Sequence, residues 1–275
     1  MKKKLCIILV VAIVICAAAG AFLHKVLPRE PVSVSEYGIG SELDPVYLTA
    51  HRGGNTDAPE NSLPAFESAR EKNFYAAECD IIRTTDGRWL ITHDDDVILH
   101  FFSFGKLSEK TYDEARKMKY SFDTNFIKYK DEKIPTLEEY LNVFTVGDTR
   151  PEIELKSPGT EGLEDVVKAI EERGLTEKAI VISFHYESLQ KIHELNENIE
   201  LWYLLHEISP EEVQKAKDLG CSSISAKYQN VTAAEIDLIS SYGLDTALWT
   251  IDDPKVVKEF YDLGVRNFVT NRLGN

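Results

Sequence analysis

The chain has little of what marks several protein classes. Of its 275 residues, only four are cysteine, 15 are glycine and 10 are proline. These numbers exclude a disulfide scaffold, a collagen-like chain and a low-complexity chain. Acidic residues outnumber basic ones by 46 to 31, which gives a net charge of −15, and no basic stripe is present. The balance argues against a nucleic-acid partner, because phosphate backbones are bound by clustered Lys and Arg.

What is present favours a folded domain. Hydrophobic residues make up 43% of the chain and charged residues 28%. A chain of this length buries enough surface for one core without cross-links. Only Cys79 and Cys221 lie beyond the N-terminal region, and we expect both to be buried thiols.

The N-terminus contains a long run without charge. Residues 5–23 are nineteen uncharged residues, which span roughly 29 Å as a helix, close to the thickness of a bilayer core. Lys2–Lys4 precede the run, which favours a cytoplasmic N-terminus and a domain outside the membrane. The alternative is a cleaved signal peptide, with Ala17–Ala19 as small residues near the cleavage site and a secreted domain as the result.

Three segments follow from this pattern. Residues 1–27 are predicted to be a transmembrane anchor or an uncleaved signal, and residues 28–45, rich in Pro, Gly, Ser and acid, a linker. Residues 46–275 are predicted to be the folded domain. The expected location is the cell membrane, spanned once, with the domain extracytoplasmic.

Short β-rich runs alternate with amphipathic segments through the domain. Eight strands are predicted, at residues 46–50, 76–80, 151–155, 179–183, 200–205, 222–226, 245–249 and 266–270. Helices are predicted between them, at residues 63–72, 136–144, 161–173, 187–196, 210–219, 233–241 and 254–263. This order predicts an α/β fold, a (β/α)8 TIM barrel, with a doubly wound open sheet as the alternative. About forty residues between His93 and Pro135 interrupt the order and predict an insertion after the second strand.

Charged residues gather at the predicted ends of the strands, where barrel enzymes carry their active sites. Glu78 and Asp80 alternate with an apolar residue and so share one strand face. Glu154 and Lys156 do the same on the next strand. Three converging carboxylates require a cation, and oxygen ligands favour one divalent ion, Ca²⁺ or Mg²⁺. Arg52, at the end of the first strand, and Lys156 are suited to phosphate oxygens.

Two histidines complete the set. His51 precedes Arg52, and His93 follows the second strand and its hairpin. An imidazole pair can act as acid and base in turn. Together with a metal and two cations, the pair indicates cleavage of a phosphodiester.

The same residues carry a resemblance to a known family. Their order resembles that of the glycerophosphodiester phosphodiesterases, through the motifs HRG (51–53), APEN (58–61), ECD (78–80), DG (86–87), HD (93–94), IPTLE (134–138), ELK (154–156), SF (183–184) and WT (249–250). The resemblance covers residues 46–275. It implies a TIM barrel that hydrolyses glycerophosphodiesters to glycerol 3-phosphate and an alcohol with a divalent metal.

The resemblance also implies roles for single residues. Metal ligands would be Glu78, Asp80 and Glu154; the acid and base would be His51 and His93; phosphate contacts would come from Arg52 and Lys156. Glu60 resembles a position beside the site, as a further ligand or an orienting residue. Trp249 is expected to line the pocket over the alcohol or headgroup, or else to pack in the core.

The chain departs from the family pattern at three places. No Arg follows the His-Asp motif within residues 97–101. Asp252 stands where the family pattern has Asn, and Asn271 where it has Asp. We expect these changes to affect substrate preference rather than to abolish activity.

Two alternatives to a soluble small-molecule substrate remain. The anchor and the cluster of Phe101, Phe102 and Phe104 suggest a membrane lysophospholipid, a lipid headgroup or a glycerophosphate polymer, although packing of the insertion would also explain the cluster. A catalytically silent binding module is the alternative of another class. The remaining histidines are expected to be structural: His100, His185, His193 and His206.

Overall fold

The structure is a computed structural model that describes Leu27, residues 31–121 and residues 123–274. The predicted membrane segment at residues 5–23 lies outside the described residues. Within the described residues, no helix combines the length and the apolar character needed to cross a bilayer.

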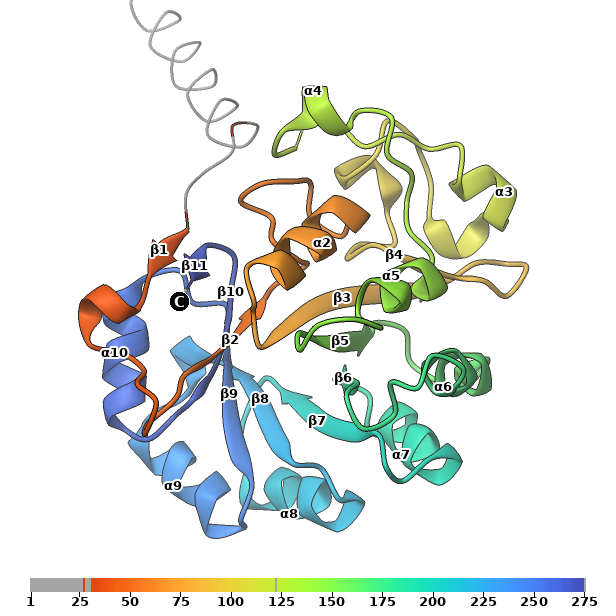
Figure 1. Cartoon of the computed structure of the whole chain (residues 1–275). Helices are drawn as coiled ribbons and strands as arrows, with labels where there is room; N and C mark the ends of the chain where they lie inside the picture. Colours follow the sequence, from red (N-terminus) through yellow and green to blue (C-terminus); the bar gives the residue numbers. More distant parts are fainter. Residues whose placement is uncertain (1–26, 28–30, 122, 275) are drawn as a thin grey trace, which may run out of the picture.

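Eight parallel strands close into a barrel (Figure 1). They are β2 (Tyr47–Ala50), β3 (Ala76–Arg83), β5 (Arg150–Leu155), β6 (Ile180–Ser183), β7 (Glu200–Leu205), β8 (Ser223–Lys227), β9 (Asp245–Trp249) and β10 (Asn267–Thr270). β10 pairs in parallel with β2, and β2 in turn with β3. This pairing closes the sheet, which confirms the predicted barrel and excludes the open-sheet alternative.

Helices cover the outside of the barrel. They are α2 (Leu63–Glu71), α5 (Leu137–Val143), α6 (Leu163–Glu171), α7 (Tyr186–Leu195), α8 (Pro210–Leu219), α9 (Ala233–Ser241) and α10 (Pro254–Asp262), with the 3-10 turn η4 (Tyr228–Asn230) before α9. Five of the seven, all but α6 and α7, begin with a side-chain cap: the Ser209 hydroxyl, for example, accepts from the backbone N–H of Glu212. At the end of α8, Gly220 adopts φ 85°, a left-handed conformation that glycine reaches without steric cost.

The second barrel strand is longer than predicted. β3 runs to Arg83 and forms an antiparallel hairpin with β4 (Trp89–Ile91). Pairing with β4 extends β3 beyond the barrel wall. The predicted strand covered only the residues expected within the barrel. β4 ends two residues before His93, and His93 lies at the cavity in the barrel.

The insertion after the hairpin is confirmed. It contains η2 (Val97–Leu99), η3 (Leu107–Glu109), α3 (Tyr112–Ala115) and α4 (Phe126–Tyr129), seen beyond β3 and β4 in Figure 1. Phe101, Leu107 and Tyr120 pack in a small apolar cluster with Ile82 and Leu90 of the hairpin. Phe102 and Phe104 do not share that burial, with 57% and 78% of their surface exposed.

Apolar residues pack on both sides of the barrel wall. Trp202, Leu204 and Ile182 lie in the inner cluster, and the larger cluster fills the space between strands and helices. Cys79 points to the outer side, toward α5, and Cys221 is also a buried free thiol, as predicted. The alternation along β3 therefore sends Glu78 and Asp80 inward.

Residues 31–45, within the segment predicted as a linker, pack onto the barrel. β1 (Val32–Ser33) pairs with β11 (Leu273–Gly274), and η1 (Ser35–Tyr37) follows. At the end of the segment, Asp44 forms an ion pair with Arg266 at 2.7 Å. Both ends of the domain are thereby tied together.

Candidate active site

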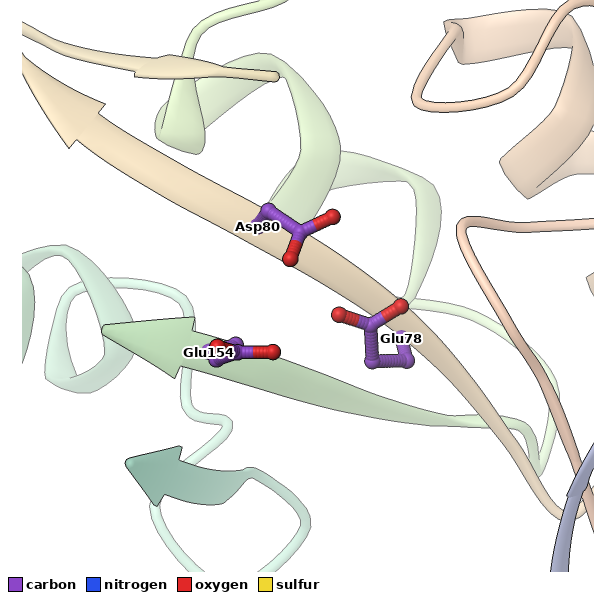
Figure 2. Close-up of side chains that lie close together, drawn as sticks. All are labelled: Glu78, Asp80 and Glu154. Carbon is purple, nitrogen blue, oxygen red and sulfur yellow. The ribbon is translucent and has the colours of Figure 1, made fainter. Parts of the chain in front are cut away.

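Four carboxylates face the inside of the barrel from two neighbouring strands. β3 and β5 are paired in a register that sets Glu78 beside Glu152 and Asp80 beside Glu154. One oxygen from each of Glu78, Asp80 and Glu154 lies within 4.8 Å of the others. Figure 2 shows the three side chains around one space, two from β3 and one from β5. The structure thus brings together the three predicted metal ligands.

The electrostatics of this group are those of crowded buried acids. Burial, then Asp80 and Glu154, raise the pKa of Glu78 well above its ordinary value. Burial, then Asp80, raises the pKa of Glu154 to about 7. Asp80 differs: burial alone would raise its pKa, but the cations of Lys156 and Arg52 bring it down to about 2. At neutral pH the group therefore keeps one firm negative charge and resists further ionisation.

The same group fits a hard divalent cation. Its donors are all carboxylate oxygens, the ligands that Ca²⁺ and Mg²⁺ prefer. Glu78 Oε1 is buried and has no hydrogen-bond partner within the described part of the chain. A buried acceptor without a donor is costly, and a cation would satisfy it. Lys156 Nζ already lies 2.9 Å from Glu154 and 3.3 Å from Asp80, which neutralises part of the charge.

A tight turn after β2 places Arg52. Its backbone is left-handed, with φ 57°, and Gly53 follows at φ 82°. A Cβ on Gly53 would lie 2.8 Å from the backbone carbon of Ala65 in α2. The turn therefore packs directly on the helix, and this contact explains why glycine follows Arg52.

Arg52 contacts three carboxylates of the site. Its backbone N–H donates to Glu78 Oε2 at 2.8 Å, and its Nε lies 3.6 Å from Asp80 Oδ2. Its Nη1 donates to Glu60 Oε1 at 2.7 Å. Glu60 thus lies beside the site and pairs with Arg52, a contact that fits the second of its two predicted roles; the group of three carboxylates does not include it.

The two predicted histidines line one cavity of about 290 Å³, together with Arg52, Lys156 and Trp249. His51 Nδ1 lies 2.8 Å from Asn271 Oδ1. Burial, then the neighbouring Arg52 cation, lowers the pKa of His51. His93 Nδ1 lies 3.1 Å from Asp94 Oδ1. Both imidazoles therefore face the same space as the carboxylates.

One wall of the cavity is aromatic. The rings of Phe184 and His206 stack at a centroid distance of 4.4 Å, and Phe184 meets Trp249 edge to face at 6.0 Å. Trp249 Nε1 is buried and donates to no acceptor among the described residues. The wall offers apolar surface and one free donor to a molecule in the cavity. His206 was expected to be structural, yet it belongs to this wall.

Sequence reasoning missed His100. Its Nε2 lies 2.8 Å from Asp94 Oδ2, and its Nδ1 lies 3.4 Å from Glu60 Oε1. The His100 imidazole therefore links Asp94, the neighbour of His93, to Glu60, the partner of Arg52. The sequence contains no signal for this contact, because the insertion has to fold before His100 meets Glu60.

Asn61 and Glu152 were also missed. Asn61 is buried, has φ 54°, and donates from Nδ2 to Asp80 Oδ2 at 2.9 Å. Its position in the motif APEN could have indicated a place at the site. Glu152 lines the cavity, accepts from the Thr49 hydroxyl at 3.2 Å, and has its pKa raised to about 8 by burial. The alternation along β5 that places Glu154 inside the barrel could have predicted the same for Glu152.

Comparison with known proteins identifies the family and agrees with the fold. The sequence profile of the glycerophosphoryl diester phosphodiesterase family matches residues 51–275. A glycerophosphodiester phosphodiesterase of Bacillus altitudinis is 30% identical over 241 residues, covering 82% of this chain and 94% of the relative. One from Caldanaerobacter subterraneus is 27% identical, covering 82% and 93%.

Solved structures of phosphodiesterases have a similar fold. The crystal structure of a glycerophosphodiester phosphodiesterase from Parabacteroides distasonis has a TM-score of 0.71 at 25% identity, covering 88% of this chain and 94% of its own. An Oleispira antarctica phosphodiesterase in complex with the product sn-glycerol-3-phosphate has a TM-score of 0.73 at 23% identity, covering 87% and 95%. This chain belongs to the glycerophosphoryl diester phosphodiesterase family and is a phosphoric diester hydrolase.

Proposed function

We propose that this protein hydrolyses glycerophosphodiesters to glycerol 3-phosphate and an alcohol, with one divalent cation, Ca²⁺ or Mg²⁺, as cofactor. One observation carries the proposal. A single cavity is lined by carboxylates able to hold a cation, by the cationic side chains of Arg52 and Lys156, and by the imidazoles of His51 and His93. Together these groups can bind a phosphodiester, stabilise its charge and transfer the protons that cleavage requires.

The cationic side chains would bind the phosphate. Glu78, Asp80 and Glu154 would hold the metal, which supplies positive charge against the phosphate oxygens when bound. Arg52 has a rigid fork of donors that suits two phosphate oxygens. Lys156 adds a compact charge from β5. Because the domain is acidic overall, this local positive charge is what would draw the substrate into the cavity.

The two histidines would move the protons. One imidazole takes the proton from the attacking hydroxyl while the other protonates the leaving alkoxide, which is worth roughly 10²–10⁴ in rate for each positioned group. The attacker is either water or the neighbouring glycerol hydroxyl, which would form a cyclic phosphate first. His51 follows β2 and His93 follows β4, so the two imidazoles enter the cavity from different segments.

The aromatic wall would receive the organic part of the substrate. Phe184 and Trp249 offer flat apolar surface beside the charged half of the cavity. The free Trp249 N–H can donate to an oxygen of the glycerol or the alcohol. This division into a charged half and an aromatic half matches a molecule with a phosphate at its centre and an uncharged arm.

A second candidate substrate is supported by the insertion. Ile98, Leu99, Phe102 and Phe104 expose about half or more of their surface close to His100, which contacts site residues. Exposed apolar residues on the insertion suit a lipid surface. In that case the substrate would be a membrane lysophospholipid, a lipid headgroup or a glycerophosphate polymer, and the chemistry would be unchanged.

The proposed location follows from the sequence. The uncharged run at residues 5–23 supports a single-pass anchor with the barrel outside the cytoplasmic membrane, or a secreted barrel if the run is cleaved. Labelling of intact cells with a membrane-impermeant reagent would test this, because only an extracytoplasmic barrel reacts.

The histidine roles can be tested by turnover. His51→Ala and His93→Ala should each lower the release of glycerol 3-phosphate by at least 10²-fold and leave the circular dichroism spectrum unchanged. His193→Ala is a matched control, because His193 lies on α7 and does not line the cavity. Near-normal turnover in either cavity variant would contradict the assigned role.

A further inference from the structure

A chain of hydrogen bonds behind the cavity runs from Asp252 to His51. Asp252 follows β9, and Asn271 follows β10. Asn271 donates from Nδ2 to Asp252 Oδ2 at 2.9 Å and from its backbone N–H to Asp252 Oδ1 at 2.7 Å. On its other side, Asn271 Oδ1 lies 2.8 Å from His51 Nδ1. Asn271 therefore stands between a carboxylate and the imidazole.

The carboxylate decides which way the Asn271 amide points. An amide can present either its oxygen or its NH₂ group to a neighbour, whereas an ionised carboxylate only accepts hydrogen bonds. If the amide were reversed, its oxygen would face Asp252 Oδ2 at hydrogen-bond distance with no proton between them. Asn55 adds to the preference, because its Nδ2 donates to Asn271 Oδ1 at 3.2 Å. The chemistry of the neighbours thus fixes the oxygen toward His51.

The amide in turn decides where His51 carries its hydrogen. Facing a carbonyl oxygen, Nδ1 has to be the protonated nitrogen, and the lone pair of the neutral ring is then on Nε2. The charged groups that act on the ring are Arg52, Asp80 and Glu60. Burial, then Arg52, lowers the pKa of His51 from its ordinary value of 6.5, which favours the neutral ring at pH 7.

We propose that Asp252 and Asn271 are positioning residues that hold His51 in the tautomer with the hydrogen on Nδ1, which leaves Nε2 free to accept a proton in the cavity. The inference rests on the proposed function of His51 as an acid–base group. Neither residue lines the cavity that contains Glu78 and Glu154; both line a neighbouring cavity on the other side of His51 and would act on the first cavity through the imidazole. The opposite tautomer would place an N–H on Nε2, where a base needs a lone pair.

The pair consists of one carboxylate and one amide, joined by a hydrogen bond of 2.9 Å. Exchanging the two side chains would keep one of each, so the contact should also form with the residues swapped. In a double variant with the two side chains swapped, the amide at position 252 would donate to the carboxylate at position 271. That carboxylate would in turn accept the hydrogen bond from His51 Nδ1.

Nitrogen-15 NMR of the imidazoles tests the tautomer without reference to activity. The full chain in detergent micelles is labelled with [¹⁵N]histidine, and His51 is assigned from the signal that is lost in His51→Gln. The expected spectrum has the protonated nitrogen at Nδ1 and the unprotonated one at Nε2. The reverse pattern in the unmodified protein would overturn the inference, whatever the enzyme's activity.

Two variants test the roles of the pair. Asp252→Asn removes the acceptor that orients the amide, so we expect mixed tautomers at His51 and a drop in kcat of at least 10-fold at unchanged KM. The double variant Asp252→Asn with Asn271→Asp should restore the single Nδ1–H tautomer and most of kcat. A single Nδ1–H tautomer in Asp252→Asn would overturn the inference, as would mixed tautomers in a folded double variant. If no version of the protein turns over any diester while the tautomers behave as expected, the proposed function fails and the positioning inference stands.

Discussion

Glu152 allows a quantitative prediction about pH and stability. This carboxyl is buried in the barrel with a pKa raised to about 8, while the ordinary pKa of an exposed glutamate is 4.5. The folded state therefore holds the proton more tightly than the unfolded state. The stability that Glu152 contributes is fully present below pH 4.5 and is lost as the pH rises toward 8.

The size of the effect follows from the two pKa values. At pH 7 the raised pKa costs the folded state ~3 kcal/mol relative to low pH, and at pH 5 the cost is ~1 kcal/mol. Glu152→Gln keeps the shape and an oxygen for the Thr49 hydroxyl but has no charge to bury. The variant should therefore be more stable than the parent by ~3 kcal/mol at pH 7 and by ~1 kcal/mol at pH 5.

Urea unfolding of the chelator-treated protein, followed by circular dichroism at several pH values, measures this difference. Glu177→Gln is the control, because Glu177 is exposed, and it should change stability equally little at every pH. A gain from Glu152→Gln that is the same at pH 5 and pH 7, or a loss at pH 7, would refute the reasoning.

Four further predictions concern the site. His100→Gln should lower kcat by about 10-fold at unchanged metal affinity in calorimetry, because it weakens the support of the His93 loop; an unchanged kcat would contradict this. Trp249→Phe removes a buried donor and should raise KM for soluble diesters several-fold, and an equal KM would show that the N–H binds no substrate. Metal affinity should fall as the pH drops below about 7, the pKa of Glu154, because binding requires the ionised form; a titration with constant affinity between pH 5 and pH 8 would argue against this ligand. Phe102→Ser with Phe104→Ser should reduce activity on lysophospholipid micelles only, and equal loss on a soluble diester would argue against a lipid-facing role.

The fold was largely predictable because its signals are local. All eight barrel strands and the seven helices between them lie within a few residues of the predicted positions. Apolar runs and helix-ending glycines such as Gly220 carry this information along the chain. Strand β3 is longer than predicted, since its last residues pair with β4 outside the barrel.

The site was predictable where residue spacing on a strand sets the direction of a side chain. Glu78, Asp80 and Glu154 meet because alternation points all three inward and parallel pairing puts the two strands side by side. His100 and Asn271 could not be placed in this way. Their contacts join segments that are distant in the sequence and are set by loops, which carry no periodic signal.

Restoration of activity by metal tests the central claim most directly. The full chain, treated with chelator, is assayed for release of glycerol 3-phosphate from glycerophosphocholine, glycerophosphoethanolamine and glycerophosphoglycerol, with Ca²⁺ or Mg²⁺ added separately. The account predicts no release without metal, and release with one of the two ions that is lost in Glu154→Gln. Full release in the presence of chelator, or no release from any diester by a folded protein that binds metal, would contradict it.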